Sequence, residues 1–366
     1  MVRRLPLLRG LAIFAVVCNH AAGWGYTAMF WWAHRYRPVV SPNFDQLGSP
    51  TYYGLVLVQQ LALFSVPAFL FISGFFIAYA AHGDARGLSW KVVRARISNL
   101  LWPYLIWSIV IFIGNGLLGK VFSPAEYTRQ LLTGAATGAF FFIPLLCQLY
   151  LLAPLIGWLG KDHPIILLSL AAAIQLLASG LFYLQLGRVH LSNTVLRSDW
   201  LFVWQAFYFP LGVVVGFRSP SIQRTISRFR WVLVVMSIIL GVVSVLESEW
   251  LYQVTENFEW AHSLVKISSS LYAVVFILAF LAFKTTKGRF SQVVDWIGMR
   301  SYGIYLLHPE LLALIARIVY HTAAWLLSQQ LLLMLILVIS GMVITLLVME
   351  GIARSPIRGI YHYLFG

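Results

Sequence analysis

Charged residues are scarce in this sequence of 366 residues: they make up 10% of the chain, and Asp and Glu together number only 12. Soluble globular domains carry about 25% charged residues. Because 60% of the residues are hydrophobic, one soluble core cannot bury them, and this excludes a soluble enzyme or a disordered chain. The composition predicts an all-α, polytopic transmembrane helix bundle, integral to the plasma (inner) membrane and surrounded by membrane lipids.

Cysteine is almost absent as well. The two cysteines, Cys18 and Cys147, both lie within apolar runs, so we expect neither a disulfide framework nor a metal cluster. The net charge of +14 would suit a nucleic-acid partner. Basic residues also collect in the cytoplasmic loops of membrane proteins, however. We therefore expect no metal and no nucleic acid.

Apolar runs separated by polar breaks predict about ten spans, since a spanning helix needs roughly 20 residues. No long polar segment follows the last run. We therefore expect a single membrane domain over residues 1–366 with no appended soluble domain. The predicted spans are 6–24, 54–80, 98–119, 137–159, 164–183, 200–217, 231–250, 264–283, 298–319 and 326–350.

Lys and Arg residues predict the orientation of the bundle. With the N-terminus inside, 18 of the 26 basic residues lie in cytoplasmic loops or at inner span ends. The predicted outer loop at 251–263 contains Glu256 and Glu259 but no Lys or Arg. This bias favours cytoplasmic N- and C-termini and explains most of the positive charge.

Two ionisable side chains lie inside the first span, where such groups are costly and usually functional. Arg9 and His20 are eleven residues apart, so they share a helix face and lie about 16 Å apart along the axis. A guanidinium suits phosphate oxygens and an imidazole suits general-base catalysis, a pairing that matches the shape of coenzyme A. The alternative is a snorkelling arginine and a packed histidine. Further basic residues near the inner mouth add to a phosphate site or are ordinary cytoplasmic charge: Arg86, Lys91, Arg94 and Arg96.

Small and polar residues interrupt two other spans. Ser73 and Gly74 allow close approach of either a helix or a ligand. Gln148 and Tyr150 lie at bilayer depth in the fourth span and therefore need hydrogen-bond partners.

The ninth span carries a polar face. Ser301, Tyr305 and His308 are spaced i, i+4, i+7 and share one side of the helix. Glu310 follows, a carboxylate well inside a span. It either orients a histidine, as a carboxylate does in a hydrolase triad, or faces an outer cavity at a Pro309 kink.

Five motifs occur in order along the chain. They are Arg9 with His20 after ten intervening residues, Phe-Ile-Ser-Gly-Phe at 71–75, and the basic segment from 96 to Pro-Tyr at 103–104. The last two run from Ile-Pro through Gln-Leu-Tyr to Pro-Leu at 143–155, and as Ser-Tyr-Gly-Ile-Tyr-Leu-Leu-His at 301–308. Together they resemble acyltransferase family 3, the integral membrane acyltransferases that O-acetylate surface glycans, over nearly the whole chain.

The resemblance implies transfer of an acyl group, usually acetyl, from cytoplasmic acetyl-CoA to a hydroxyl of an extracytoplasmic glycan or glycolipid. It makes His20 the general base, although an acyl-His20 intermediate stays open, and it suggests glycan-synthesis or export proteins as partners. We assign CoA binding to Arg9, Arg94, Arg96 and Ser73, catalysis to His20 and Glu310, and substrate binding to Gln148, Tyr150, Tyr305 and His308.

Two other classes of protein share some of these features. A transporter or flippase also has many spans, kinking prolines and buried polar groups. A scaffold of a polysaccharide-synthesis complex is the third class. A transporter moves substrate without consuming acetyl-CoA, and a scaffold tolerates loss of His20.

Overall fold

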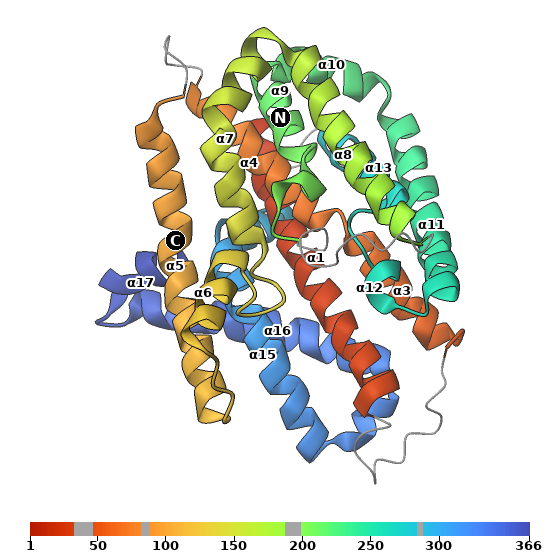
Figure 1. Cartoon of the computed structure of the whole chain (residues 1–366), viewed down its shortest axis with the longest axis vertical. Helices are drawn as coiled ribbons and strands as arrows, with labels where there is room; N and C mark the ends of the chain where they lie inside the picture. The colour runs from red at the N-terminus through yellow and green to blue at the C-terminus, as the bar shows by residue number, and fades with distance from the viewer. Residues whose placement is uncertain (33–46, 82–87, 187–198, 284–287) are drawn as a thin grey trace.

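A computed structural model describes the chain except residues 33–46, 82–87, 187–198 and 284–287 (Figure 1). The described residues form helices, turns and bends and no β-strand. The α-helices are α1 (Leu5–Tyr26), α3 (Pro50–Ala62), α4 (Ser65–Ala81), α5 (Trp90–Leu117), α6 (Pro124–Thr133), α7 (Phe142–Asp162), α8 (Pro164–Leu186), α9 (Tyr208–Phe217), α10 (Ser219–Arg228), α11 (Arg230–Thr255), α12 (Phe258–Ala261), α13 (Ile267–Ala282), α14 (Arg289–Met299), α15 (Ser301–Thr322), α16 (Gln330–Arg354) and α17 (Tyr361–Phe365). Shorter helical turns are η1 (Val2–Arg4), η2 (Thr27–Trp32), η3 (Phe202–Gln205), η4 (Ala324–Ser328) and η5 (Arg358–Ile360).

The predicted all-α, polytopic membrane bundle is confirmed. Within the described residues, 8 helical segments are long and apolar enough to cross a membrane. Two shorter apolar helices, α9 with 10 residues and α13 with 16, occupy the sixth and eighth predicted spans. The protein is therefore a multi-pass integral membrane protein.

Helix α1 runs through the middle of the bundle (Figure 1). It packs against α3, α4, α14, α15 and α16. Many of its buried positions are small, which lets neighbouring helices approach closely. The two candidate functional residues of the first span are therefore placed at the centre of the molecule. The small buried residues of α1 are Gly10, Ala12, Ala15, Ala21, Ala22 and Gly25.

The predicted span at 54–80 is two helices, which is a difference from the sequence prediction. Leu63 and Phe64 separate α3 from α4. Pro67 lies in the first turn of α4, where its missing N–H leaves no helical bond unmade. The sixth span, 200–217, is likewise divided into η3 and the short helix α9. Both breaks place irregular backbone within predicted spans, and such backbone is tolerated only where protein or a cavity surrounds it.

Helices α4 and α9 cross with their backbones in contact. A Cβ on Gly74 would lie 2.1 Å from the carbonyl oxygen of Phe209, and one on Gly212 would lie 2.0 Å from that of Phe71. Only glycine fits at these two positions. Close approach of a helix, the first of the two expectations for Ser73-Gly74, is therefore what the structure shows at Gly74.

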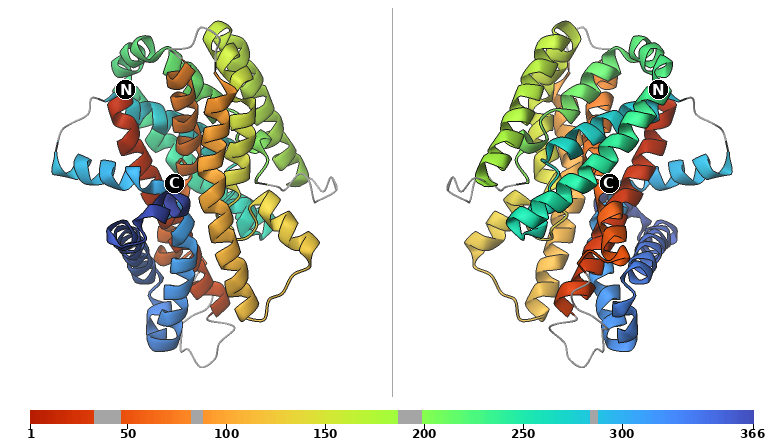
Figure 2. Two further views of the ribbon diagram at one scale, coloured as in Figure 1. Left: turned by 90° about the vertical axis from the view of Figure 1, so that its left-hand side faces the viewer. Right: turned by 90° about the vertical axis from the view of Figure 1, so that its right-hand side faces the viewer.

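Helix α14 projects from the rest of the bundle (Figure 2). It packs on the beginning of α1, where a Cβ on Gly10 would lie 2.2 Å from the carbonyl oxygen of Val294. A Cβ on Gly298 would lie 2.4 Å from the carbonyl oxygen of Pro6. The other face of α14 exposes Phe290, Val293 and Met299. The helix is thus attached through glycine contacts on one face and presents apolar side chains on another.

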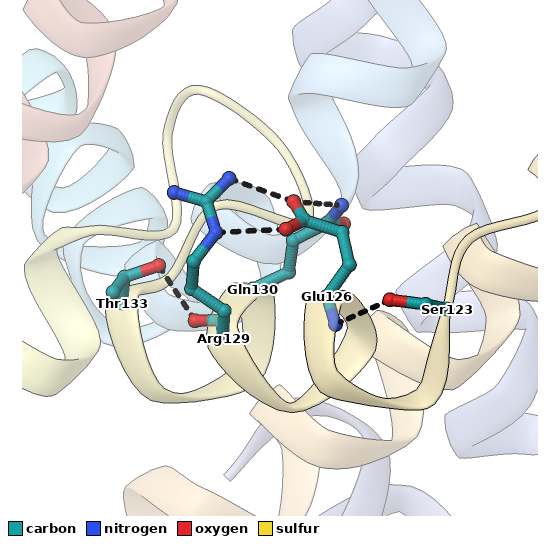
Figure 3. Close-up of polar contacts among 5 residues, drawn as sticks. All are labelled: Ser123, Glu126, Arg129, Gln130 and Thr133. Carbon is teal, nitrogen blue, oxygen red and sulfur yellow. Dashed lines mark hydrogen bonds and ion pairs between the residues drawn. The ribbon is translucent and has the colours of Figure 1, made fainter.

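Helix α6 lies between the third and fourth predicted spans and carries its own polar network (Figure 3). The Ser123 hydroxyl accepts from the Glu126 N–H at 3.2 Å, which caps the helix. The Arg129 guanidinium donates two hydrogen bonds to the Glu126 carboxylate, at 2.9 and 2.7 Å. These bonds, with one from Gln130, lower the pKa of Glu126 to about 2.

Candidate functional site

A cavity of ≈ 520 Å³ lies among the helix breaks. Its walls come from α1, the α3–α4 junction, α15, the end of α8, and the segments 138–142, 199–204 and 260–265. Asn19, His20, Ser65 and Tyr305 supply polar groups to it. In the predicted orientation the end of α8 and the segments 138–142, 199–204 and 260–265 belong to the outer side of the membrane, so the cavity is expected to open outwards.

His20 lines this cavity and lies next to a second histidine. The His20 ring on α1 and the His308 ring on α15 have centroids 5.1 Å apart. His308 is fully buried, and its Nδ1 lies 3.0 Å from the carbonyl oxygen of Ile304. A carbonyl only accepts, so this contact requires the proton on Nδ1, and in the neutral ring it leaves a lone pair on Nε2. That Nε2 is buried without a partner among the described residues.

Tyr305 completes this part of the site. Its ring centroid lies 6.3 Å from that of His308, and its hydroxyl donates to the carbonyl oxygen of Ala139. The neighbouring Asn19 has a buried Oδ1 without a partner among the described residues. Unpartnered buried polar atoms are rare in proteins and mark positions where a ligand or water can bind.

Basic residues gather at the other end of α1. The Arg9 guanidinium lies within electrostatic range of Tyr150 and of Arg96. Neither arginine forms an ion pair within the described part of the chain, and the Nε of Arg96 is buried without a partner there. Two neighbouring guanidinium groups without a carboxylate suit phosphate oxygens.

The chain matches the family model for the acyltransferase domain over residues 2–350. It belongs to acyltransferase family 3. Two curated relatives from Staphylococcus aureus, of strains MRSA252 and MSSA476, are each 23% identical to it over 263 residues, covering 70% of this chain and 71% of the relative. Each is named "Probable poly-beta-1,6-N-acetyl-D-glucosamine export protein". No solved structure matches the chain.

The structure brings together only some of the residues that the sequence assigned to CoA binding in this family 3 member. Arg9 and Arg96 lie within electrostatic range of each other, but Arg94 is exposed and lines a separate apolar groove with Trp90 and Trp102 on α5. Ser73 is half-buried and, like Arg9, is not among the described residues that line the cavity. Arg86 lies outside the described residues.

The residues assigned to substrate binding and catalysis also lie in different places. Tyr305 lines the cavity and His308 lies behind it, whereas the Gln148 amide donates to the carbonyl oxygen of Trp200 at 2.7 Å and accepts from the Phe202 N–H at 3.3 Å. Glu310 is exposed, and no hydrogen bond joins it to either histidine within the described residues. The structure therefore places His308, rather than Glu310, beside His20.

Sequence reasoning missed a group of cavity residues in the outer segments. Trp204, Trp260 and His262 line the cavity, but hydropathy assigns the first to the predicted span 200–217 and the other two to the outer loop 251–263, and it marks none of them as a site residue. The sequence did contain an indirect signal for these segments. Polar side chains inside the spans need hydrogen-bond partners, and outer segments can supply them. The spanning residues that hold the outer segments by hydrogen bonds are Gln60, Gln175, Ser179 and Ser248.

Proposed function

We propose that this protein transfers an acyl group, acetyl in the first instance, from cytoplasmic acyl-CoA to a hydroxyl of a surface polysaccharide or glycolipid across the plasma membrane. Family membership supports acyl transfer as the reaction class. The observation that carries the assignment to residues is the pair of histidines at the cavity, 5.1 Å apart, with His20 facing the open space.

His20 acts as the general base. Its ring nitrogen takes the proton from the acceptor hydroxyl while that oxygen attacks the thioester carbonyl carbon. The carbon–sulfur bond then breaks, and the CoA thiolate takes up the proton from the His20 imidazolium. The products are an ester and free CoA, so atoms and charge balance without a further reactant.

His308 orients His20. Its Nε2 lone pair is free to accept from an N–H of the His20 ring, because Nδ1 is already committed to the Ile304 carbonyl. Such a hydrogen bond fixes the His20 tautomer and leaves its other nitrogen available as the base. This gives to His308 the orienting role that the sequence assigned to Glu310.

Arg9 and Arg96 bind the phosphates of the donor. On α1, Arg9 lies eleven residues before His20, which is about 16 Å along the helix axis. The pantetheine arm of CoA spans such a distance, so a donor held by these arginines brings its thioester towards His20. Holding the two reactants in place supplies much of the rate enhancement expected of such a site.

Release of free thiol from acetyl-CoA tests the proposal. Purified protein in lipid nanodiscs is compared with His20→Ala and with Arg9→Ala, with and without crude surface glycan. We expect thiol release that rises with glycan and is lost in His20→Ala. Equal release by wild type and His20→Ala would contradict the proposal.

Polysaccharide export is the second candidate, because the Staphylococcus aureus relatives carry that name. An exporter moves glycan across the membrane whether or not acetyl-CoA is present. Glycan movement into sealed vesicles that is unchanged in His20→Ala and needs no acyl donor would favour export over acyl transfer.

A further inference from the structure

A second part of the cavity wall is aromatic. Phe182 from α8, Trp204 from η3 and Trp260 from α12 all line the cavity, and we call them the aromatic wall. The rings of Phe182 and Trp260 have centroids 4.7 Å apart at an interplanar angle of 33°. Polar groups of Asp199 and His262 line the same cavity. The wall thus combines flat apolar faces with hydrogen-bonding groups.

Three side chains from two spanning helices, α8 and α11, hold the backbone behind this wall. Each is a neutral polar residue inside an apolar helix, and each donates to a backbone carbonyl of an outer segment. The bonds run from Gln175 to Trp204 at 3.0 Å, from Ser179 to Val265 at 2.8 Å and from Ser248 to Ala261 at 2.8 Å. A site whose support is built into rigid elements is pre-organised for a ligand.

Lys266 extends this support. Its ammonium group is fully buried and donates to the side-chain oxygen of Gln60 at 2.7 Å and to the carbonyl oxygen of Ser244 at 3.2 Å. The Gln60 amide in turn reaches the carbonyl oxygen of Ala261 at 3.4 Å. The segment between α12 and α13 is therefore fixed at both of its ends. Burying a cation and several amides costs free energy, and the structure they maintain is the cavity wall.

The chemistry of the wall distinguishes between ligands. The described lining residues include no Lys or Arg, so the phosphates of a nucleotide have no partner there. An acyl chain needs no polar groups, yet Trp204 is buried with an indole N–H that has no partner among the described residues. A pyranose ring has C–H bonds on its faces and hydroxyls on its edge. Its faces pack against aromatic rings, and its hydroxyls form hydrogen bonds with polar groups.

We propose that the aromatic wall is the acceptor subsite and binds a neutral or amino-substituted pyranose. Trp204 and Trp260 contact the ring face, the Trp204 N–H donates to a sugar oxygen, and the Asp199 carboxylate accepts from a hydroxyl or amine. An acidic sugar is disfavoured because its carboxylate meets the Asp199 carboxylate. This inference rests on the proposed function, because the bound sugar is an acceptor only if the protein transfers an acyl group. Sugar binding itself is testable without the acyl donor.

Binding of a defined sugar in the absence of acetyl-CoA tests the subsite. The probe is an N-acetylglucosamine tetramer, titrated into wild-type protein in nanodiscs and followed by saturation-transfer NMR and calorimetry. We expect Trp260→Leu to weaken binding about tenfold, the scale of losing one aromatic contact. The matched control is Trp158→Leu on α7, where the indole is 53% exposed outside the cavity. It is expected to bind as wild type does.

Two further measurements keep the outcome decisive. Trp204→Phe keeps the aromatic face but removes the N–H, so it is expected to fold and to bind a few-fold more weakly than wild type. A galacturonic acid tetramer is expected to bind more weakly than the neutral tetramer. No binding by wild type, equal binding by Trp260→Leu and Trp158→Leu, or stronger binding of the acidic sugar would each overturn the proposal.

Failure of the subsite is distinguishable from failure of the proposed function. Sugar binding that depends on Trp260, together with thiol release that does not depend on His20, would leave the subsite in place and remove acyl transfer. Thiol release that depends on His20, without any effect of Trp260→Leu on sugar binding, would support acyl transfer and overturn the subsite.

Discussion

The two ends of α1 are built in opposite ways. Around its beginning, helices touch through glycines, as Gly10 does with Val294 and Gly298 with Pro6. Around His20, the neighbouring spans break and leave a cavity of ≈ 520 Å³. Buried polar atoms there, on Asn19, Trp204 and His308, have no partner among the described residues. Helices are closely packed at one end of α1, whereas the other end borders an open cavity.

This difference explains why polar residues occur inside the spans. A helix that breaks within a membrane leaves backbone groups that need partners. Here the Gln148 side chain forms hydrogen bonds with the backbone of Trp200 and Phe202, and the Gln175 side chain with that of Trp204. Most of the buried polar side chains at the cavity end therefore maintain its shape, and the groups left unpartnered are the candidates for chemistry.

The largest effect is expected at the histidine pair. His20→Ala removes the base and is expected to lower acyl transfer by about 10²-fold or more. His308→Ala leaves the base but not its orientation, so a smaller loss of about tenfold is expected, with a changed pH–rate profile. Because the two act as a unit, the double variant is expected to match His20→Ala. Independent, multiplicative losses measured by thiol release would contradict this coupling.

Substitution of arginine near the beginning of α1 is expected to change the KM for acetyl-CoA. Arg9→Ala removes a charge-assisted contact worth about 1.5–3 kcal/mol, so KM for acetyl-CoA is expected to rise about tenfold or more. Arg94→Ala is the matched control, because Arg94 is exposed on the other side of α5. Equal changes in KM for the two variants would show that general positive charge, and not the Arg9–Arg96 pair, attracts the donor.

Close packing is tested at Gly74. Gly74→Ala puts a Cβ 2.1 Å from the Phe209 carbonyl oxygen, and overpacking of this kind costs about 1–3 kcal/mol. Gly157→Ala on α7 is the control, since nothing lies within 4 Å of its added Cβ. We expect a lower thermal unfolding temperature in detergent for the first variant only. Similar temperatures for both would mean that α4 and α9 do not pack this closely.

The smallest effect is expected outside the spans, at α6. The pKa of Glu126 is lowered to about 2 by Arg129 and Gln130, so its contribution is present above the unfolded value and is lost as pH falls towards 2. Glu126→Gln is expected to raise amide hydrogen exchange in α6 slightly at neutral pH. That difference is expected to shrink below about pH 4. A difference that is constant over this range would exclude the ion pair as its cause.

Hydropathy and helical periodicity predicted much of this molecule. All ten apolar segments occur, and the shared face of Tyr305 and His308 follows from their spacing. The roles of Glu310 and Arg94 stay predictions, but the same periodicity argues against both. Each lies two residues from a neighbour that faces the site, and two residues are a turn of about 200° on a helix.

Other features were not accessible to periodicity. The break at Leu63 and Phe64 has no strong local signal, because Pro67 comes where a helix can begin as well as where one can kink. The aromatic wall is formed by the end of α8 and two short helices, η3 and α12, from distant parts of the sequence, which come together only through tertiary contacts. Its positions depend on side-chain-to-backbone bonds such as Ser179 to Val265 at 2.8 Å.

Transfer across the membrane is the central claim, and sidedness tests it most directly. Protein of known orientation in sealed proteoliposomes is given acetyl-CoA on the side of its N-terminus and an N-acetylglucosamine oligosaccharide on the other side. We predict an acetylated oligosaccharide only in this arrangement, with none formed by His20→Ala. Product that forms only when donor and acceptor share one side of the membrane would contradict the account.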